Sequence, residues 1–256
     1  MDTAPARRAR TMAQWTLAGS FGYVGGPLLL AVALWLGVGC RGAILALAIA
    51  TLPVLWFARR LPVPAEHAHT SVRASIRSAL ASLRDKEVLR RLLTLEAVDL
   101  LLDVFHGFLA LYFVDVVGVR PALGALAVAV WTTAGLVGDA ALVLVLRHVA
   151  PRAYLRASAV AALVAYPAFL VVPGAASKLV LAAVLGLVNS GWYALPKASL
   201  YDALPGRSGA AVAVGGFGGL IGALVPLALG VLAGAVGLHA AMWTLLLAPV
   251  ALLALT

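Results

Sequence analysis

The sequence predicts an all-α membrane protein, a bundle of about eight transmembrane helices. Of its 256 residues, 63% are hydrophobic and only 11% are charged, and the mean hydropathy is +1.03. A water-soluble domain of this length needs more polar surface than this composition supplies. The apolar residues also form runs of about 20, the length of a membrane-crossing helix, whereas a β-barrel would show short alternating segments.

Eight apolar runs are long enough to cross a bilayer, and the second, which contains Pro53, is the shortest. The predicted spans cover about residues 13–38, 42–58, 92–117, 122–146, 154–173, 179–200, 209–233 and 236–256. They divide the chain into two helices in 1–58, a basic cytoplasmic linker in 59–91 and a six-helix bundle in 92–256. In the seventh span, glycines at short spacing predict close helix packing.

Basic residues predict the orientation, because cytoplasmic loops of membrane proteins are enriched in Lys and Arg. The outer loops would hold only Arg41, Arg120 and Lys178. The cytoplasmic side would hold fifteen: Arg7, Arg8, Arg10, Arg59, Arg60, Arg73, Arg77, Arg84, Lys86, Arg90, Arg91, Arg147, Arg152, Arg156 and Arg207. We therefore expect an integral protein of a bacterial plasma membrane with both termini in the cytoplasm.

The long loop at 59–91 begins with Pro62 and Pro64, which favour an extended chain, and continues as a predicted amphipathic helix. From Thr70 or Ser71 through Arg91, an apolar face would lie beside arginines, and this face consists of Val72, Ile76, Leu80 and Leu83. Such a helix lies on the inner leaflet, or it packs on the ends of the bundle as a solvated linker.

The remaining composition excludes several classes of site. The net charge of +9 is accounted for by the basic loops, so we expect no nucleic-acid partner. Cys40 is the only cysteine, which rules out an internal disulfide and a thiolate metal cluster. His67 and His69 are too few to make a zinc site. We therefore expect neither a metal nor a cofactor.

The third span is unusual because it carries four ionisable residues: Glu96, Asp99, Asp103 and His106. At 100° per residue their side chains fall within an arc of about 80° on one helical face. Ionisable groups at membrane depth are costly, so a span that keeps four of them predicts a functional site.

Motifs in the first and fourth spans resemble those of major facilitator superfamily transporters. The first span contains GYVGGP at Gly22–Pro27, similar to part of the fifth-helix motif of that family's antiporters. The fourth span ends with Gly135, Gly138 and Asp139, followed by Arg147 and Arg152, and resembles the family's gating motif between helices eight and nine. The stretch 185–219 is similar to helices ten and eleven.

The order of the spans carries the same resemblance over nearly the whole chain. Two spans, a long basic inner loop and six further spans resemble helices five to twelve of a twelve-helix member. Such a transporter binds its substrate between two six-helix halves. The resemblance therefore implies secondary active transport of a small molecule, by uptake or efflux and coupled to protons. It also implies missing N-terminal helices or a partner chain that supplies them.

By this resemblance the stripe on the third span faces a central cavity. We expect Asp103 to be the coupling-proton or substrate site, with His106 as its hydrogen-bonding neighbour and with Asp99 and Glu96 nearby. Glu96 and Asp99 have an alternative role, because the bases at Arg90 and Arg91 lie near enough to pair with them.

Two further sets of residues complete the predicted site. The sixth span brings Asn189, Trp192 and Tyr193 to membrane depth, where they suit an amphipathic substrate or ordinary interhelical packing. Asp139 is expected to form a gating salt bridge with Arg147, Arg152 or Lys197, or a local contact at the helix end.

Two other functions stay open on the sequence. Asp99 and Asp103 form D-x-x-x-D on one helical face, which also suits Mg²⁺ held against a diphosphate in an intramembrane prenyl or phosphatidyl transferase. That enzyme class uses a second acidic helix, which this chain lacks. The second alternative is that the chain is a non-transporting membrane subunit or a remnant of a transporter.

Overall fold

The computed structural model describes residues 5–37, 39–60, 76–77, 80–204 and 208–256, and within these ranges it contains helices and no strand. Five of the described helical segments are long and apolar enough to cross a membrane, and a sixth, Ala175–Val188, is shorter. The predicted all-α membrane bundle is therefore confirmed. His67, His69 and most of the predicted linker helix lie outside the described residues.

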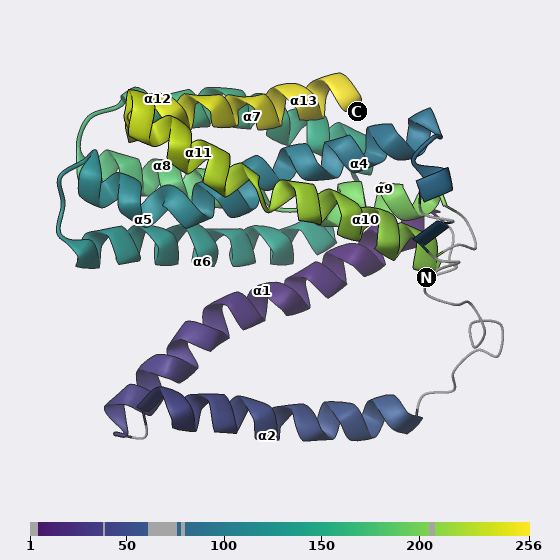
Figure 1. The fold of residues 1–256 in the computed structure, drawn as a ribbon, viewed down its shortest axis with the longest axis horizontal. Helices are drawn as coiled ribbons and strands as arrows, with labels where there is room; N and C mark the ends of the chain where they lie inside the picture. Colours follow the sequence, from purple (N-terminus) through teal and green to yellow (C-terminus); the bar gives the residue numbers. More distant parts are fainter. Residues whose placement is uncertain (1–4, 38, 61–75, 78–79, 205–207) are drawn as a thin grey trace.

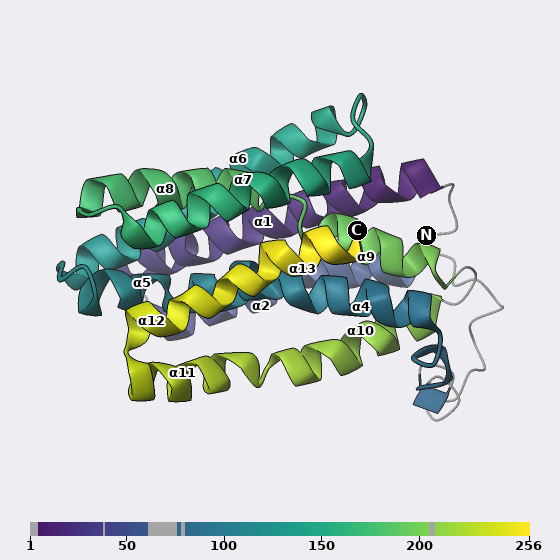
Figure 2. The same cartoon turned by 90° about the horizontal axis from the view of Figure 1, so that it is seen from above.

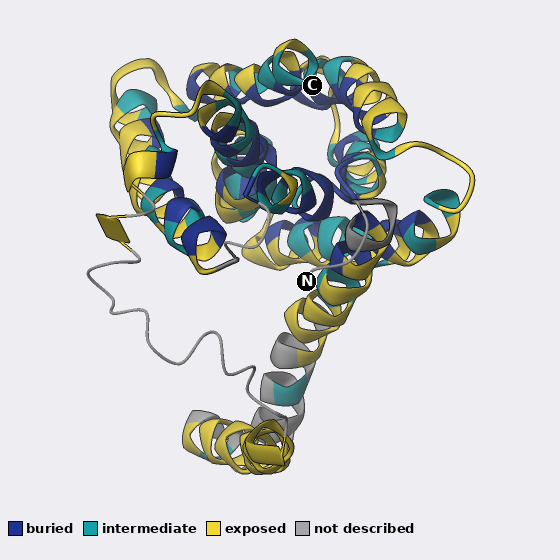
Figure 3. Cartoon of the chain, turned by 90° about the vertical axis from the view of Figure 1, so that its right-hand side faces the viewer, coloured by how far each residue is buried: buried dark blue, intermediate teal, exposed yellow. Residues whose placement is uncertain are grey.

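The first two spans form a hairpin of α1 (Pro5–Trp35) and α2 (Gly39–Arg60). α1 packs against α6 and α9 of the bundle. α2 contacts α1 and lies away from the other helices (Figure 1). Residues 44–60 of α2 are all exposed, and Figure 3 shows this helix as a separate arm. Exposed Leu, Ile, Trp and Phe side chains are compatible with a lipid-facing helix.

The third span is a continuous helix made of α4 (Lys86–Asp99), a π-helical turn (Leu100–Val104) and α5 (Phe105–Asp115). It begins earlier than the predicted residue 92 because the Asp85 carboxylate caps it, accepting from the Glu87 N–H at 2.8 Å. A turn at 83–85 ends the preceding segment, so the linker helix predicted to run through Arg91 is interrupted there.

The next two spans are α6 (Pro121–Val145) and α7 (Pro151–Val171), and each has a proline in its first turn. Proline suits this position because its fixed φ is helical and its missing N–H is not needed there. The predicted sixth span is divided into α8 (Ala175–Val188) and α9 (Ala194–Asp202). Gly191, at a φ of 75°, lies in the turn between them.

The chain ends with two helical segments on the side of α4. The first is α10 (Ser208–Gly222) followed by α11 (Val225–Val236), and the second is α12 (Leu238–Met242), a 3₁₀ turn (Trp243–Leu246) and α13 (Leu247–Leu255). α13 packs against α4 and α7, and α10 packs against α4 (Figure 2).

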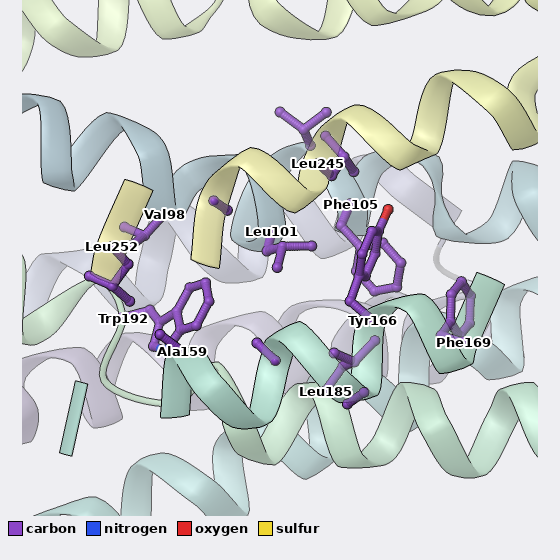
Figure 4. Close-up of a cluster of buried hydrophobic side chains, with 14 of the residues drawn as sticks. Val98, Leu101, Phe105, Ala159, Tyr166, Phe169, Leu185, Trp192, Leu245 and Leu252 are labelled. Carbon is purple, nitrogen blue, oxygen red and sulfur yellow. The ribbon is translucent and has the colours of Figure 1, made fainter. Parts of the chain in front are cut away.

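An aromatic core joins α5, α7 and α8 and fixes the positions of the helices around the site (Figure 4). Phe105 lies edge-on to Tyr166 and Phe169, at centroid distances of 5.6 and 5.3 Å. The Tyr166 hydroxyl donates to the Met242 carbonyl at 2.7 Å, so this buried polar group is satisfied. The core therefore connects the α5–α7–α8 layer to the C-terminal segment.

Candidate functional site

A cavity of about 550 Å³ opens between α1, the α4–α5 helix, α6 and the turn after α8. Its lining includes three aspartates, a histidine and four aromatic residues, and contains no Lys or Arg among the residues described. The lining consists of Trp15, Thr16, Ala18, Gly19, Ser20, Tyr23, Asp99, Leu102, Asp103, His106, Trp131, Thr132, Gly135, Leu136, Asp139, Gly186, Asn189, Ser190, Gly191 and Tyr193.

Three of the four residues in the predicted stripe meet at one cavity. Asp99, Asp103 and His106 line the cavity, but Glu96 instead packs on α10 beside Gly218 and Gly222. Glu96 and Asp99 both lie in α4, before the π turn, so the turn does not separate these two residues. A π turn holds more residues than an α turn, so it rotates Asp103 and His106 relative to α4 and away from an ideal α-helical register.

Arg90 and Arg91 have a partner other than Glu96 or Asp99. Glu87 bonds to Arg90 at 3.0 Å and to Arg91 at 2.5 Å, within the first turns of α4. These are i,i+3 and i,i+4 pairs of the kind that neighbouring residues on a helix surface form. The alternative in which these arginines explain the buried acids therefore finds no support in the described contacts.

Asn189 links the cavity wall to the π turn. Its side-chain nitrogen donates to the Leu101 carbonyl at 3.4 Å, and the residue is only 3% exposed. The other side-chain atom, Oδ1, is buried and has no hydrogen-bond partner among the described residues. This oxygen is an acceptor at the edge of a cavity, where it would be expected to bind a donor.

Aromatic rings form much of the remaining wall. Trp15 of α1 stacks with Tyr193 at a centroid distance of 6.3 Å, and the His106 ring stacks on Trp131 at 5.1 Å. The indole nitrogen of Trp131 is buried without a partner in the described part of the chain. The cavity thus combines flat apolar faces with a small number of polar atoms, as binding sites for small molecules do.

Asp139 ties α1 to α6 and to the turn after α8. Its carboxylate accepts from the Ser20 hydroxyl at 2.6 Å and from the Gly191 N–H at 3.3 Å. Arg147 and Arg152 are exposed beyond the end of α6, and no contact with Asp139 is seen for either in the described residues. The gating salt bridge stays a prediction.

A comparison with solved structures places this arrangement in a known fold. The chain is similar to a major facilitator superfamily (MFS) transporter, FucP, in the outward conformation, with a TM-score of 0.65 and 17% sequence identity. The chain has the fold of an MFS transporter. The similarity covers 84% of this chain and 53% of FucP, so this chain spans about half the length of that transporter. The resemblance expected from the sequence is confirmed at the level of the fold.

Comparisons of sequence alone add nothing to this result. No protein-family model matches the chain, and no curated protein matches it significantly. At 17% identity the likeness to FucP shows the fold alone. Together with the apolar helices, it identifies an integral membrane protein with an MFS-like helical bundle.

Within the MFS-like bundle, Trp192 lies in the core rather than on the cavity wall. It is fully buried, and its indole N–H donates to the Ser158 hydroxyl at 2.9 Å. Its neighbour Tyr193 does line the cavity, because consecutive residues after Gly191 point in different directions. The structure therefore separates two aromatic residues that the sequence analysis grouped together.

The MFS-like bundle also brings in residues that the sequence analysis did not assign to the site. Trp15, Ser20 and Tyr23 of α1 and Trp131 of α6 line the cavity. These side chains are uncharged and nothing in the sequence marks them as neighbours of the acids, so only the packing of α1 against α6 reveals them. Lys197, which the sequence offered as a further partner for Asp139, does not line the cavity, and its nitrogen lies 5.3 Å from the Tyr193 ring centre.

A magnesium site at Asp99 and Asp103 receives no support from their surroundings. Among the described residues, no group of three or more His, Cys, Asp and Glu side chains is arranged to hold a metal ion. Mg²⁺ sites do use one or two carboxylates. In prenyl and phosphatidyl transferases, however, substrate phosphates also bind the metal, and basic side chains hold those phosphates. The residues lining this cavity offer no such base.

Proposed function

We propose that this chain carries out secondary active transport of a small molecule, coupled to protons, with Asp103 as the coupling-proton or substrate site. One observation carries the proposal: Asp99 and Asp103 line a cavity between membrane helices, and the described lining contains no basic side chain to neutralise them. Such carboxylates attract protons or cationic groups of a substrate. The proposal covers both uptake and efflux.

His106 is proposed as the neighbour of Asp103 in this role. Both residues line the cavity, and they are one turn apart on the same helix. The imidazole ring stacks on Trp131, which restricts its orientation. A histidine held in this way beside a carboxylate provides a second group able to bind and release a proton.

We further propose that the bundle end at which α1 begins and α13 ends faces the cytoplasm, in a bacterial plasma membrane. The Arg59–Arg60 end of α2, the start of α4 and the α6–α7 turn lie at this same end (Figure 1). These segments carry many of the basic residues counted from the sequence, and positive charge favours the cytoplasmic side.

Labelling at the two ends of α6 tests this orientation. In a Cys40→Ala background, Arg120→Cys and Arg147→Cys each place one thiol at an exposed position. A membrane-impermeant maleimide applied to intact cells is expected to label the first variant and not the second. The reverse pattern would invert the proposed topology.

Proton flux driven by a solute tests the transport proposal without a labelled substrate. The full chain is reconstituted in vesicles that contain a pH-sensitive dye, and a panel of cationic, neutral and anionic solutes is added outside. We expect at least one solute to change the lumenal pH, and Asp103→Asn to abolish that change. Asp115→Asn, on the exposed outer part of the same helix, is the matched control and is expected to retain it.

Two outcomes would count against the proposal. Unchanged flux in Asp103→Asn would remove this residue from coupling. The absence of flux with every solute, from a chain that circular dichroism shows to be folded, would favour the alternative of a non-transporting membrane subunit.

A further inference from the structure

The cavity keeps two acidic residues even after Asp139, which already has hydrogen-bond partners, is set aside. Asp139 accepts two hydrogen bonds within the protein, from Ser20 and from Gly191. Asp99 and Asp103 form no hydrogen bond or ion pair with any of the described residues. Lys197 is not part of the lining, and its nitrogen lies 5.3 Å from the ring centre of Tyr193. A ligand in this cavity therefore meets carboxyl groups and no basic side chain among the described lining residues.

The unpaired oxygen of Asn189 adds a requirement that charge alone does not. The side-chain nitrogen of this residue already donates to the Leu101 carbonyl, which fixes the amide orientation, because a flipped amide would place two acceptors together. Oδ1 is therefore the atom left without a partner, on a residue that is 3% exposed and lines the cavity. A buried acceptor of this kind needs a donor, and a ligand N–H supplies one.

The aromatic wall defines the rest of the ligand. Trp15, Tyr23, Trp131 and Tyr193 present ring surfaces to the cavity, which is large enough for a small molecule. Aromatic faces bind flat apolar groups and also attract cations.

We infer that this cavity binds small organic cations that carry N–H donors, namely primary or secondary amines attached to a flat apolar group. The ammonium is held by Asp99 and Asp103, one of its N–H groups is donated to Asn189 Oδ1, and the apolar group lies against the aromatic rings. As a statement about the transported substrate, this inference rests on the proposed transport function. As a statement about binding, it stands separately.

Four probes built on the same phenyl group separate charge from hydrogen bonding: 2-phenylethylamine, its N,N,N-trimethyl derivative, 2-phenylethanol and phenylacetate. Binding to the full chain in lipid nanodiscs is measured by calorimetry, with empty nanodiscs subtracting partition into lipid. We expect the amine to bind best, the trimethyl derivative about tenfold more weakly because it has no N–H to donate, and the alcohol more weakly than the amine. Phenylacetate is expected not to bind.

Variants assign these differences to residues. Asn189→Leu is expected to remove most of the difference between the amine and its trimethyl derivative. Asp99→Asn is expected to reduce the difference between the amine and the alcohol, and it keeps the inference testable if Asn189→Leu fails to fold. Asp115→Asn is expected to leave all four affinities unchanged. Equal binding of amine and alcohol, preferential binding of phenylacetate, or no binding of any probe would overturn the inference.

The binding assay and the proton-flux assay fail independently. Amine binding without amine-driven flux would contradict the transport proposal and leave the ligand class in place. Flux driven by neutral or anionic solutes, and not by amines, would support transport and contradict the ligand class.

Discussion

Asn189 donates its side-chain N–H to the main-chain carbonyl of Leu101, at 3.4 Å, where the α4–α5 helix contains its π turn. Backbone groups that leave the regular α-helical pattern inside a membrane protein need a partner, because lipid supplies none. The amide of Asn189 provides that partner from the end of α8. The same contact leaves Oδ1 buried without a donor, on a residue that lines the cavity. One residue thus supports the helix that carries Asp99 and Asp103 and also contributes to the site.

Replacing Asn189 by leucine should destabilise the bundle. The Leu101 carbonyl would lose its side-chain donor, and the loss of one such hydrogen bond costs about 0.5–1.5 kcal/mol. The thermal unfolding midpoint in detergent measures the loss. Thr132→Val is the matched control, because Thr132 also lines the cavity but donates to Val128 within its own helix. A midpoint shift no larger than that of the control would show that the Leu101 contact contributes little.

Because α6 packs closely against α8, we expect alanine substitutions of Gly135 and Gly186, which lie opposite each other, to differ in their effect on stability. A Cβ on Gly186 would overlap the main-chain oxygen of Trp131 and approach the nitrogen of Gly135 at 3.1 Å, and a helix backbone cannot move aside. A Cβ on Gly135 would meet its nearest neighbour, the Gly186 oxygen, at an ordinary 3.7 Å. Gly186→Ala should therefore cost about 1–3 kcal/mol of stability.

Thermal unfolding of the two variants side by side checks this, with Gly135→Ala as the matched control. The control is expected to unfold near the parent temperature. Equal destabilisation by both substitutions would indicate that the cost arises from helix geometry in general and not from the close approach at Gly186.

The sequence predicted the layout of the spans better than the details within them. Runs of apolar residues marked α6 and α7, because bilayer thickness sets the length of a membrane-crossing helix. The division of the sixth span at residues 189–193 was missed although Asn189, Ser190 and Gly191 form a turn signal. Apolar residues on both sides of this signal make the whole stretch long enough to be taken as one membrane span.

The site was predicted only in part for a similar reason. Asp99, Asp103 and His106 stood out because charge is rare in an apolar span, and the structure brings them to one cavity. Glu96 stood out equally, but its side chain packs against the glycines of α10 and not at the cavity. Trp15 and Trp131 carried no signal, because only the packing of two distant helices makes them neighbours of the acids.

Substitutions of Asp139 distinguish its observed contacts from a gating ion pair. In the structure it accepts hydrogen bonds from Ser20 and Gly191, and asparagine keeps one acceptor for Gly191 while its amide can donate to the Ser20 hydroxyl. Asp139→Asn is therefore expected to retain most of the stability that Asp139→Ala loses, about 1–3 kcal/mol. Thermal unfolding measures both. If asparagine is as damaging as alanine, the negative charge itself is required, as a salt bridge with Arg147 or Arg152 would demand.

Lys178 lies at the opposite end of the bundle from Arg147, and we expect its replacement to destabilise the end of α7 locally. It is only 6% exposed, and its side-chain nitrogen donates to the carbonyls of Phe169 and Leu170 in the last turn of α7. The last carbonyls of a helix lack partners within the helix, and a cation there also complements the helix dipole. Lys178→Met keeps the length of the side chain but removes the donor, so hydrogen exchange over 169–177 should become faster. Ser177→Ala, which removes only bonds to Pro173 and Gly174, should change this exchange less. Unchanged exchange in Lys178→Met would show that α7 ends stably without the lysine.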